Sequence, residues 1–228
     1  TETTDVVVNP EPAGTLSNSG PVCEGSTVDL IFTATVGTGP FDIVVDGVPY
    51  AGVASGAVFA TLTEGVDFTG NTTFTLTSIT DTGVTPNCAA TVTETTDVTV
   101  VPQPAGTISN NGPICENSTV DLTFTATVGT GPYDIVVDGV PYAGVASGAV
   151  FATLTEGVDF TGNTTFTLTS ITDTGVTPNC TATVTETTDV VVNPEPAGTI
   201  SNDGPICIGG SIDLTFTATV GTGPFDIV

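Results

Sequence analysis

One unit of 92 residues repeats along this chain, and the repeat limits what the chain can fold into. The segment Thr-Glu-Thr-Thr-Asp-Val begins at Thr1, again at Thr93 and again at Thr185. Residues Asp42–Cys88 recur without a change as Asp134–Cys180. A unit of this length matches a small domain that has its own core. Near-identical domains in series are typical of chains that span a distance, resist bending or bind at several points, and they are less typical of enzymes.

Pro-x-Pro triplets mark the junctions between the units. Such triplets are locally extended and stiff, so they are expected to act as hinges with limited bending. We expect residues 1–10 to be the last strand of a preceding repeat and residues 195–228 to be the first part of a truncated third repeat. The two complete repeats are then repeat 1 (residues 11–102) and repeat 2 (residues 103–194). The triplets are Pro10-Glu11-Pro12, Pro102-Gln103-Pro104 and Pro194-Glu195-Pro196.

Alternation of apolar and polar residues predicts β-strands. In the segment from Ser26 to Val36, apolar side chains fall on one face and Thr or Asp side chains on the other. Repeat 2 changes Ile31 on the outer face to Thr123, whereas the inner positions stay apolar. This pattern indicates a strand with one buried face. The expected inward residues are Val28, Leu30, Phe32 and Val36.

The other segments of the unit complete an all-β pattern. Asp46-Gly47 lies between apolar runs and predicts a two-residue hairpin, because this turn needs positive φ at both central residues. With strands near 13–17, 57–63, 72–80 and 89–101, each unit has about seven strands. We therefore predict tandem immunoglobulin-like β-sandwich domains of about 92 residues, arranged as beads on a string. The alternative is a β-solenoid, but the unit shows no shorter internal period.

The charge balance excludes several classes of function. The 228 residues include 25 Asp and Glu but no Lys, Arg or His, which leaves a formal net charge of −25. Such a chain cannot neutralise phosphates, so neither nucleic acid nor an anionic membrane surface is an expected partner. Hydrophobic residues make up 39% of the chain, so it is not a disordered acidic tail. No apolar run reaches the roughly 18–20 residues of a membrane-spanning helix, so we expect no membrane insertion.

The five cysteines predict disulfides and an extracellular location. Cys23, Cys88, Cys115, Cys180 and Cys207 are separated by 65, 27, 65 and 27 residues, which gives two per unit. No Cys-x-x-Cys pair and no His is present, so this spacing favours disulfides in an oxidising compartment over zinc.

The pairing of the cysteines has two candidate solutions. Pairs within a unit, Cys23–Cys88 and Cys115–Cys180, are slightly favoured because most bridges stay inside one domain. However, an immunoglobulin-like order places the two cysteines of a unit at opposite poles, roughly 30 Å apart, whereas a bridge needs Cα atoms about 6 Å apart. The alternative is a Cys23–Cys180 bridge between successive repeats.

Among the carboxylates, the one candidate functional site that the sequence suggests is a calcium site. Glu64, Asp67, Asn71 and Asp81 cluster around expected loops, and oxygen ligands of this kind can bind Ca²⁺. No Asp-x-Asp-x-Asp-Gly loop is present, however. No nucleophile–base pair, metal cluster or cofactor loop stands out, so we expect neither an enzyme nor a cofactor other than calcium.

Glycans are candidate modifications and candidate ligands. Asn71, Asn117 and Asn163 each begin an Asn-x-Ser/Thr sequon, and exposed Thr and Ser could carry O-linked sugar. Tyr50 and Tyr142 lie just past the expected hairpin turns and are the aromatic residues most expected to be exposed.

Several segments resemble one group of bacterial repeats. These are Gly112–Cys115, Asp121–Gly139, Thr165–Ser170 and Cys180. Together they are similar to the PKD-like, immunoglobulin-like tandem repeats of large Bacteroidota cell-surface adhesins and filamentous secreted proteins. The resemblance implies export, a cell-surface location and a mechanical or adhesive role, and it implies no catalytic residues.

Two functional hypotheses follow. The first is a structural segment of an extracellular filament or stalk that associates with copies of itself, because identical units present the same surface at regular intervals. The second is a multivalent adhesin whose repeats each bind glycan or another surface ligand. An adhesin predicts exposed aromatic residues in a groove, but only 6% of the residues are aromatic and Trp is absent.

Overall fold

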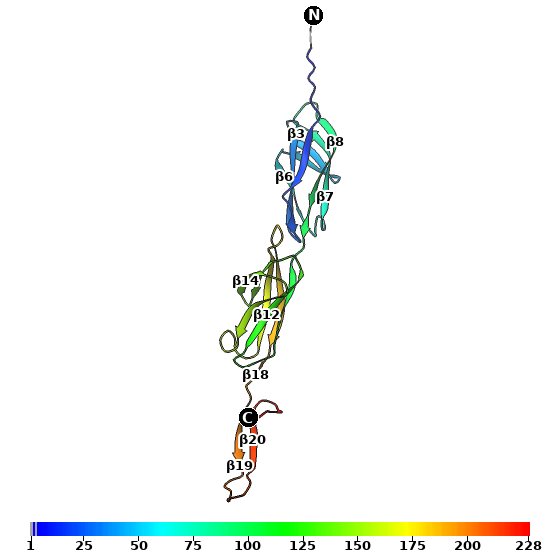
Figure 1. The fold of residues 1–228 in the computed structure, drawn as a ribbon. Helices are drawn as coiled ribbons and strands as arrows, with labels where there is room; N and C mark the ends of the chain where they lie inside the picture. Colours follow the sequence, from blue (N-terminus) through cyan, green and yellow to red (C-terminus); the bar gives the residue numbers. More distant parts are fainter. Residues whose placement is uncertain (1, 3) are drawn as a thin grey trace. The chain divides into compact units, whose positions relative to one another are not determined.

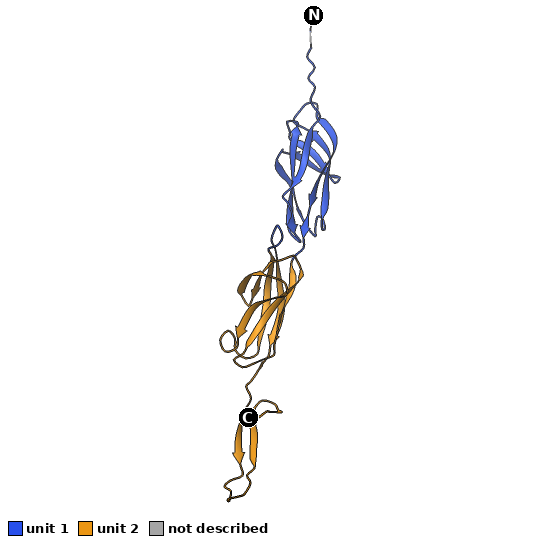
Figure 2. Cartoon of the chain, in the orientation of Figure 1, with its two compact units in different colours: residues 1–103, 174–180 blue, residues 104–173, 181–228 orange. Residues whose placement is uncertain are grey.

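The computed structural model of the protein describes residue 2 and residues 4–228. Every regular secondary-structure element in this part of the chain is a β-strand (Figure 1). The residues form two compact units (Figure 2). Unit 1 consists of residues 1–103 and 174–180, and unit 2 consists of residues 104–173 and 181–228. The prediction of tandem all-β sandwiches is confirmed. Each complete repeat has two sheets that enclose a core, and no solenoid forms in the described residues.

Repeat 1 is a sandwich of a three-stranded and a four-stranded sheet. The first sheet has the order β1-β3-β6 and the second has the order β5-β4-β7-β8. All neighbours in these two sheets are antiparallel, whereas the short strands β2 and β9 pair in parallel. The strands are β1 (Ala13–Asn18), β2 (Val22–Cys23), β3 (Thr27–Val36), β4 (Phe41–Val45), β5 (Val48–Val53), β6 (Ala57–Thr63), β7 (Thr72–Asp81), β8 (Cys88–Val98) and β9 (Val100–Val101).

Repeat 2 builds the same sandwich from nearly the same sequence. Its sheets have the orders β10-β12-β15 and β14-β13-β16-β17, and β11 pairs in parallel with β18. The strands are β10 (Ala105–Asn110), β11 (Ile114–Cys115), β12 (Thr119–Val128), β13 (Tyr133–Val137), β14 (Val140–Val145), β15 (Ala149–Thr155), β16 (Thr164–Asp173), β17 (Cys180–Val190) and β18 (Val192–Asn193).

The core of each repeat lies between its two sheets. In repeat 1, Phe32 from the three-stranded sheet meets Phe41 from the four-stranded sheet edge-to-face, with ring centroids 5.4 Å apart. Both rings are almost fully buried, and burial of a large apolar side chain stabilises a fold by about 1.5–3 kcal/mol. Repeat 2 replaces Phe41 with Tyr133, and this ring keeps the same contact with Phe124 at 5.3 Å.

Most of the expected inward residues are buried, but Val36 is not. Val28, Leu30 and Phe32 are fully buried, which confirms the alternation along β3. Val36 is 38% exposed. It pairs with Ala13 at the end of the strand, where the register between β1 and β3 shifts, so the period of two does not extend to it.

The turn predicted at Asp46-Gly47 joins β4 to β5. Both residues have positive φ, 47° and 80°, as a two-residue hairpin turn of this type requires. The Asp46 carboxylate also accepts a hydrogen bond from the Thr75 backbone N–H at 3.0 Å. The turn therefore sets the register of β5 and also contacts the neighbouring strand β7.

The third repeat contributes only two paired strands, β19 (Ala197–Asn202) and β20 (Leu214–Val220). Ile200 is 62% exposed and Leu214 is 69% exposed, whereas the equivalent residues of repeat 2, Ile108 and Leu122, are buried. Residues 4–12 contain no strand, although we expect residues 1–10 to be the final strand of a preceding repeat. The predicted boundaries of the repeats stay a prediction. The first boundary between the two compact units falls between Gln103 and Pro104.

A disulfide joint as the candidate functional site

The strand that carries Cys23 lies next to the end of repeat 1. Val22 donates its backbone N–H to the carbonyl of Thr99 at 3.0 Å, and Glu24 donates to the carbonyl of Val101 at 2.9 Å. These bonds pair β2 with β9, the last strand before the Pro102-Gln103-Pro104 hinge. Cys23 is therefore positioned at the end of the sandwich from which the chain leaves for the next repeat.

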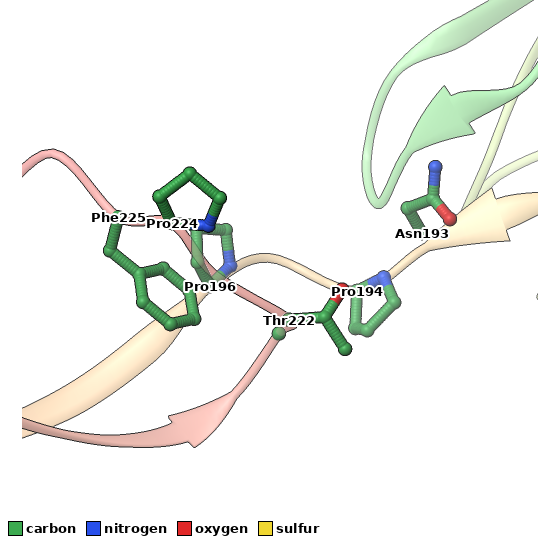
Figure 3. Close-up of a pocket in the computed structure, with 7 residues that line it drawn as sticks. Asn193, Pro194, Pro196, Thr222, Pro224 and Phe225 are labelled. Carbon is green, nitrogen blue, oxygen red and sulfur yellow. The ribbon is translucent and has the colours of Figure 1, made fainter.

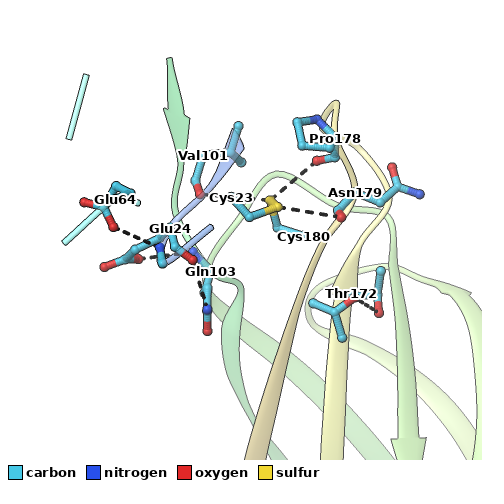
Figure 4. The surroundings of a disulfide bond; sticks show 11 residues. Cys23, Glu24, Glu64, Val101, Gln103, Thr172, Pro178, Asn179 and Cys180 are labelled. Atoms are coloured by element: carbon cyan, nitrogen blue, oxygen red, sulfur yellow. Dashed lines mark hydrogen bonds between the residues drawn. A yellow bond between two sulfur atoms is a disulfide. The ribbon is translucent and has the colours of Figure 1, made fainter. Parts of the chain in front are cut away.

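Cys180 forms a disulfide with Cys23, and the Cα atoms of the pair lie 5.6 Å apart (Figure 4). Cys180 follows the loop 174–179, and both cysteines belong to unit 1. The Cys23 sulfur lies 3.7 Å from the carbonyl oxygen of Asn179, and the Cys180 sulfur lies 4.0 Å from that of Val101. Because bonded sulfurs carry no hydrogen, these are packing contacts. We call this bridge and its neighbours the disulfide joint.

The slightly favoured pairing within each repeat, Cys23–Cys88 and Cys115–Cys180, is not the one that forms. Cys23 pairs in register with Val101, just beyond one end of β8, whereas Cys88 is the first residue of β8 at its other end. The 11 residues of β8 span roughly 35 Å, far more than the roughly 6 Å that a bridge allows. Cys88, Cys115 and Cys207 carry free thiols.

The hinge after repeat 1 is also held by hydrogen bonds. Gln103 donates its backbone N–H to the Glu24 carboxylate at 3.3 Å and its side-chain amide to the Glu24 carbonyl at 3.2 Å. In repeat 2 the backbone N–H of Glu195 donates to the Glu116 carboxylate at 3.2 Å. The sequence did not reveal this contact, because nothing local pairs a Glu with a residue 79 positions later.

The four calcium candidates do not come together as one group, although Glu64 and Asn71 line the same hollow. Asn71 directly precedes β7 and Asp81 ends it, so the two are separated by the ten-residue length of that strand, roughly 30 Å. The Glu64 carboxylate accepts hydrogen bonds from the backbone N–H groups of Gly25 and Gly70 at 2.9 and 3.1 Å. The Asp67 carboxylate accepts one from the backbone N–H of Thr63 at 2.7 Å. These oxygens are used by the fold itself. Within residue 2 and residues 4–228, no three His, Cys, Asp or Glu side chains are grouped to hold a metal ion.

Two of these carboxylates stay ionised more readily than usual because backbone N–H groups bind them. The bond from Gly25, followed by that from Gly70, lowers the pKa of Glu64. The bond from the Thr38 backbone lowers the pKa of Asp81, with further help from Gly83 and Gly39 against the opposing effect of burial.

Asp81 organises a loop through its carboxylate. Its carboxylate accepts the backbone N–H groups of Thr38 at 2.8 Å, Gly39 at 3.1 Å and Gly83 at 2.9 Å. Asp173 repeats the contacts to Thr130 and Gly131 in repeat 2. The Asp-Thr-Gly sequence was the available signal, since Asp two residues before Gly is typical of a capped turn.

The neighbouring Tyr133 shows the opposite electrostatic effect. Burial raises the pKa of the Tyr133 hydroxyl, and the nearby Asp173 carboxylate adds to the rise because it disfavours a second negative charge. Tyr133 therefore stays neutral as a core residue.

The three sequons occupy two different environments. The side-chain oxygens of Asn71 and Asn163 accept backbone N–H groups from Val100 and Val192 at 2.7 and 2.8 Å. Asn117 lies exposed in a turn with a φ of 59°. Asn71 and Asn163 therefore anchor the last strand of their repeats, whereas Asn117 does not. Glycosylation of any of the three stays a prediction.

The expected exposed aromatics lie half-buried in a shallow hollow. Tyr50 packs edge-to-face on Phe59 at 4.8 Å, and Tyr142 packs on Phe151 at 4.9 Å. Each hollow lies between β5 and β6, or between β14 and β15, which are edge strands of the two sheets. The same surface therefore occurs in both repeats.

Another hollow lies at the start of the third repeat (Figure 3). Asn193, Pro194, Pro196, Thr222, Pro224 and Phe225 line it together with Gly221. Phe225 corresponds to Phe41 and Tyr133, and its ring meets Phe216 edge-to-face at 5.6 Å, as Phe41 meets Phe32 and Tyr133 meets Phe124. The hollow thus lies between the Pro194-Glu195-Pro196 hinge and the segment that follows β20.

No helix in the described part of the chain has the length and apolar character needed to cross a membrane.

Comparisons with known proteins add little. No model of a known protein family matches the sequence, and no curated protein matches it. Among solved structures, the chain is similar to an I-band fragment of titin, at 12% identity and a TM-score of 0.36 over 92% of this chain and 77% of that one. It is also similar to the fibronectin(III)-like modules of Clostridium thermocellum CbhA, at 11% identity and a TM-score of 0.35 over 79% of this chain and 95% of that one. At such scores the fold rests on the sheets described above.

Proposed function

We propose that this chain is a structural repeat segment of an extracellular, cell-surface filament or stalk. The observation that carries the proposal is the disulfide joint, which ties a residue of repeat 1 covalently to a residue of repeat 2. A bridge of this kind persists in oxidising surroundings, such as the outside of a cell. Covalent ties between successive domains serve a chain that must stay connected and extended, and they serve no catalytic step.

The sequence supports the location independently. The resemblance to the PKD-like repeats of Bacteroidota surface proteins implies export and display. A chain with 25 acidic residues and no cation also stays soluble at high local density, because like charges repel.

Immunogold labelling of intact, unpermeabilised producing cells tests this role. Antibodies raised against the folded repeats are expected to label thin structures outside the cell envelope. Labelling that appears only after the cells are permeabilised would contradict the proposal.

The finer part of the proposal is association of the filament with copies of itself. Repeats 1 and 2 present the same outer surfaces, so any contact made by one can be made again by the next. The edge strand β5 contains Pro49, which limits strand-to-strand pairing at that edge. We therefore place the self-contacts on side-chain surfaces and not on open sheet edges.

A second candidate function is multivalent adhesion, and the repeated aromatic hollow is the observation that favours it. Tyr50 and Tyr142 each line a hollow beside small residues and are partly exposed, and an aromatic ring in such a place is a surface on which a sugar ring could stack. Binding on a glycan array that is lost in the Tyr50→Ala/Tyr142→Ala variant would support adhesion. The matched control is Tyr133→Phe, which changes a buried tyrosine to the residue that repeat 1 carries.

A further inference from the structure

The disulfide joint closes a covalent loop that contains most of both repeats. Cys23 and Cys180 are 157 positions apart in the sequence, yet their Cα atoms are only 5.6 Å apart. Strands β3 to β16 lie between them, and these strands carry nearly all of the buried core. If extended, the closed segment would measure about 550 Å.

From this connectivity we infer that the disulfide removes both cores from the path of tension along the chain and acts as a reducible stop on its extension. Tension between the two ends follows the shortest covalent route. It runs through β1 and β2 to Cys23, crosses the sulfur–sulfur bond and continues from Cys180 along β17. Residues 24–179 carry no end-to-end tension while the bond is intact.

The stop does not depend on whether the inner strands stay folded. Tension can pull β1 away from β3 and β17 away from β16, because these strands lie on the route and pair with strands inside the loop. Even if the rest of the sandwich then unfolds, the separation of Cys23 and Cys180 stays fixed by the bond. Only the residues outside the loop can lengthen, and they measure roughly 250 Å when extended.

The free cysteines show that the same joint can recur along an array. Cys115 lies in β11, which pairs with β18 as the strand of Cys23 pairs with β9. The Cys88 thiol lies 3.8 Å from the carbonyl of Asn9 and 3.7 Å from that of Pro86. Cys180 has the equivalent neighbours, Val101 and Pro178. Cys115 and Cys88 thus each have the surroundings of one half of the joint.

Reduction by a dithiol releases the stop. A thiolate of the dithiol attacks one sulfur and forms a mixed disulfide, and its second thiol then displaces the cysteine. In total, the cysteine pair gains two electrons and two protons and becomes two thiols, while the dithiol becomes a cyclic disulfide. Cys23 is partly exposed, whereas Cys180 is buried, so the attack is expected at the Cys23 sulfur.

Single-molecule stretching between the two ends of the chain tests this inference. The oxidised protein is expected to extend by at most about 250 Å, and dithiothreitol added under load should release a further length of about 550 Å in total, whether the two sandwiches inside the loop unfold together or one after the other. The Cys23→Ser/Cys180→Ser variant should extend fully, to about 800 Å, with or without dithiothreitol. The Cys88→Ser/Cys115→Ser variant keeps the joint and should behave as the wild type.

Two results would overturn the inference. One is full extension of the oxidised wild-type chain. The other is an oxidised chain that extends to about 350 Å and releases only about 450 Å in total on reduction, which would indicate one bridge inside each repeat. The experiment concerns the purified chain alone, so its outcome is separate from the cell-surface location under the proposed function.

Discussion

Asp81 shows how a single residue can be identified by type and still be assigned the wrong role. A carboxylate near loops is a reasonable calcium ligand, and the sequence grouped Asp81 with Glu64, Asp67 and Asn71. Their grouping failed because distance along the chain is not distance in space: β7 places Asp81 at the opposite end of the sandwich from Asn71. The three backbone N–H groups that bind Asp81 come from positions that only the folded chain brings together.

The loop contacts of Asp81 predict a pH-dependent contribution to stability. Because the pKa of Asp81 is lowered in the fold, its contribution is complete above the ordinary value of 3.8 and is lost as the pH falls through the folded pKa. The Asp81→Asn variant should have a lower Tm than the wild type at pH 7. This difference should shrink once the pH is well below 3.8. A Tm difference that stays constant over this pH range would contradict the assignment.

The alternation along β3 predicts very different costs for adjacent substitutions. Phe32→Ala removes a fully buried ring and should lower the free energy of unfolding of repeat 1 by about 3–5 kcal/mol. Ile31→Thr introduces the residue that repeat 2 already carries on the outer face, and it should cost about 0.5 kcal/mol or less. Chemical denaturation of both variants checks this, and similar costs would refute the inward and outward assignment.

At the scale of elements, the sequence predicted the strands well and their connections poorly. Period-two alternation and turn residues are local signals, so the strand Ala57–Thr63 and the Asp46-Gly47 hairpin were placed correctly. The cysteine partners are not local, and the regular spacing of two per repeat fits both pairings. The expected strand order already placed the two cysteines of a repeat at opposite poles, and the pairing of Cys23 with Val101 in the fold shows that this argument should have decided between them. The contact of Tyr50 with Phe59 was missed for the same reason, because it joins two different sheets.

The β4–β5 hairpin predicts a strict preference at Gly47. Its φ of 80° is a conformation that β-branched residues avoid. Gly47→Val should therefore destabilise repeat 1 by about 1–3 kcal/mol. Gly47→Asn is the matched control, because Asn tolerates this conformation better and should cost clearly less. Thermal unfolding of the two variants makes the comparison, and equal losses would argue against the turn.

At the scale of the whole molecule, charge should govern association between copies. With a net charge of −25 and no cation, two chains repel strongly at 10 mM salt, where screening acts only beyond about 30 Å. At 150 mM salt the screening length falls to about 8 Å, so self-association should increase with salt. Sedimentation velocity over a concentration series at both salt levels measures this. A monomer at every concentration and salt level would count against lateral assembly.

The central claim is that separate β-sandwiches follow one another in the chain and that a disulfide joins repeat 1 to repeat 2. Digestion of the unreduced, alkylated protein with a glutamate-specific protease tests it most directly, because the five cysteines then fall in five different peptides. We predict that the peptide 3–24, which contains Cys23, is recovered in disulfide linkage with the peptide 157–186, which contains Cys180. Linkage of 3–24 to the Cys88 peptide 65–94 would contradict the account.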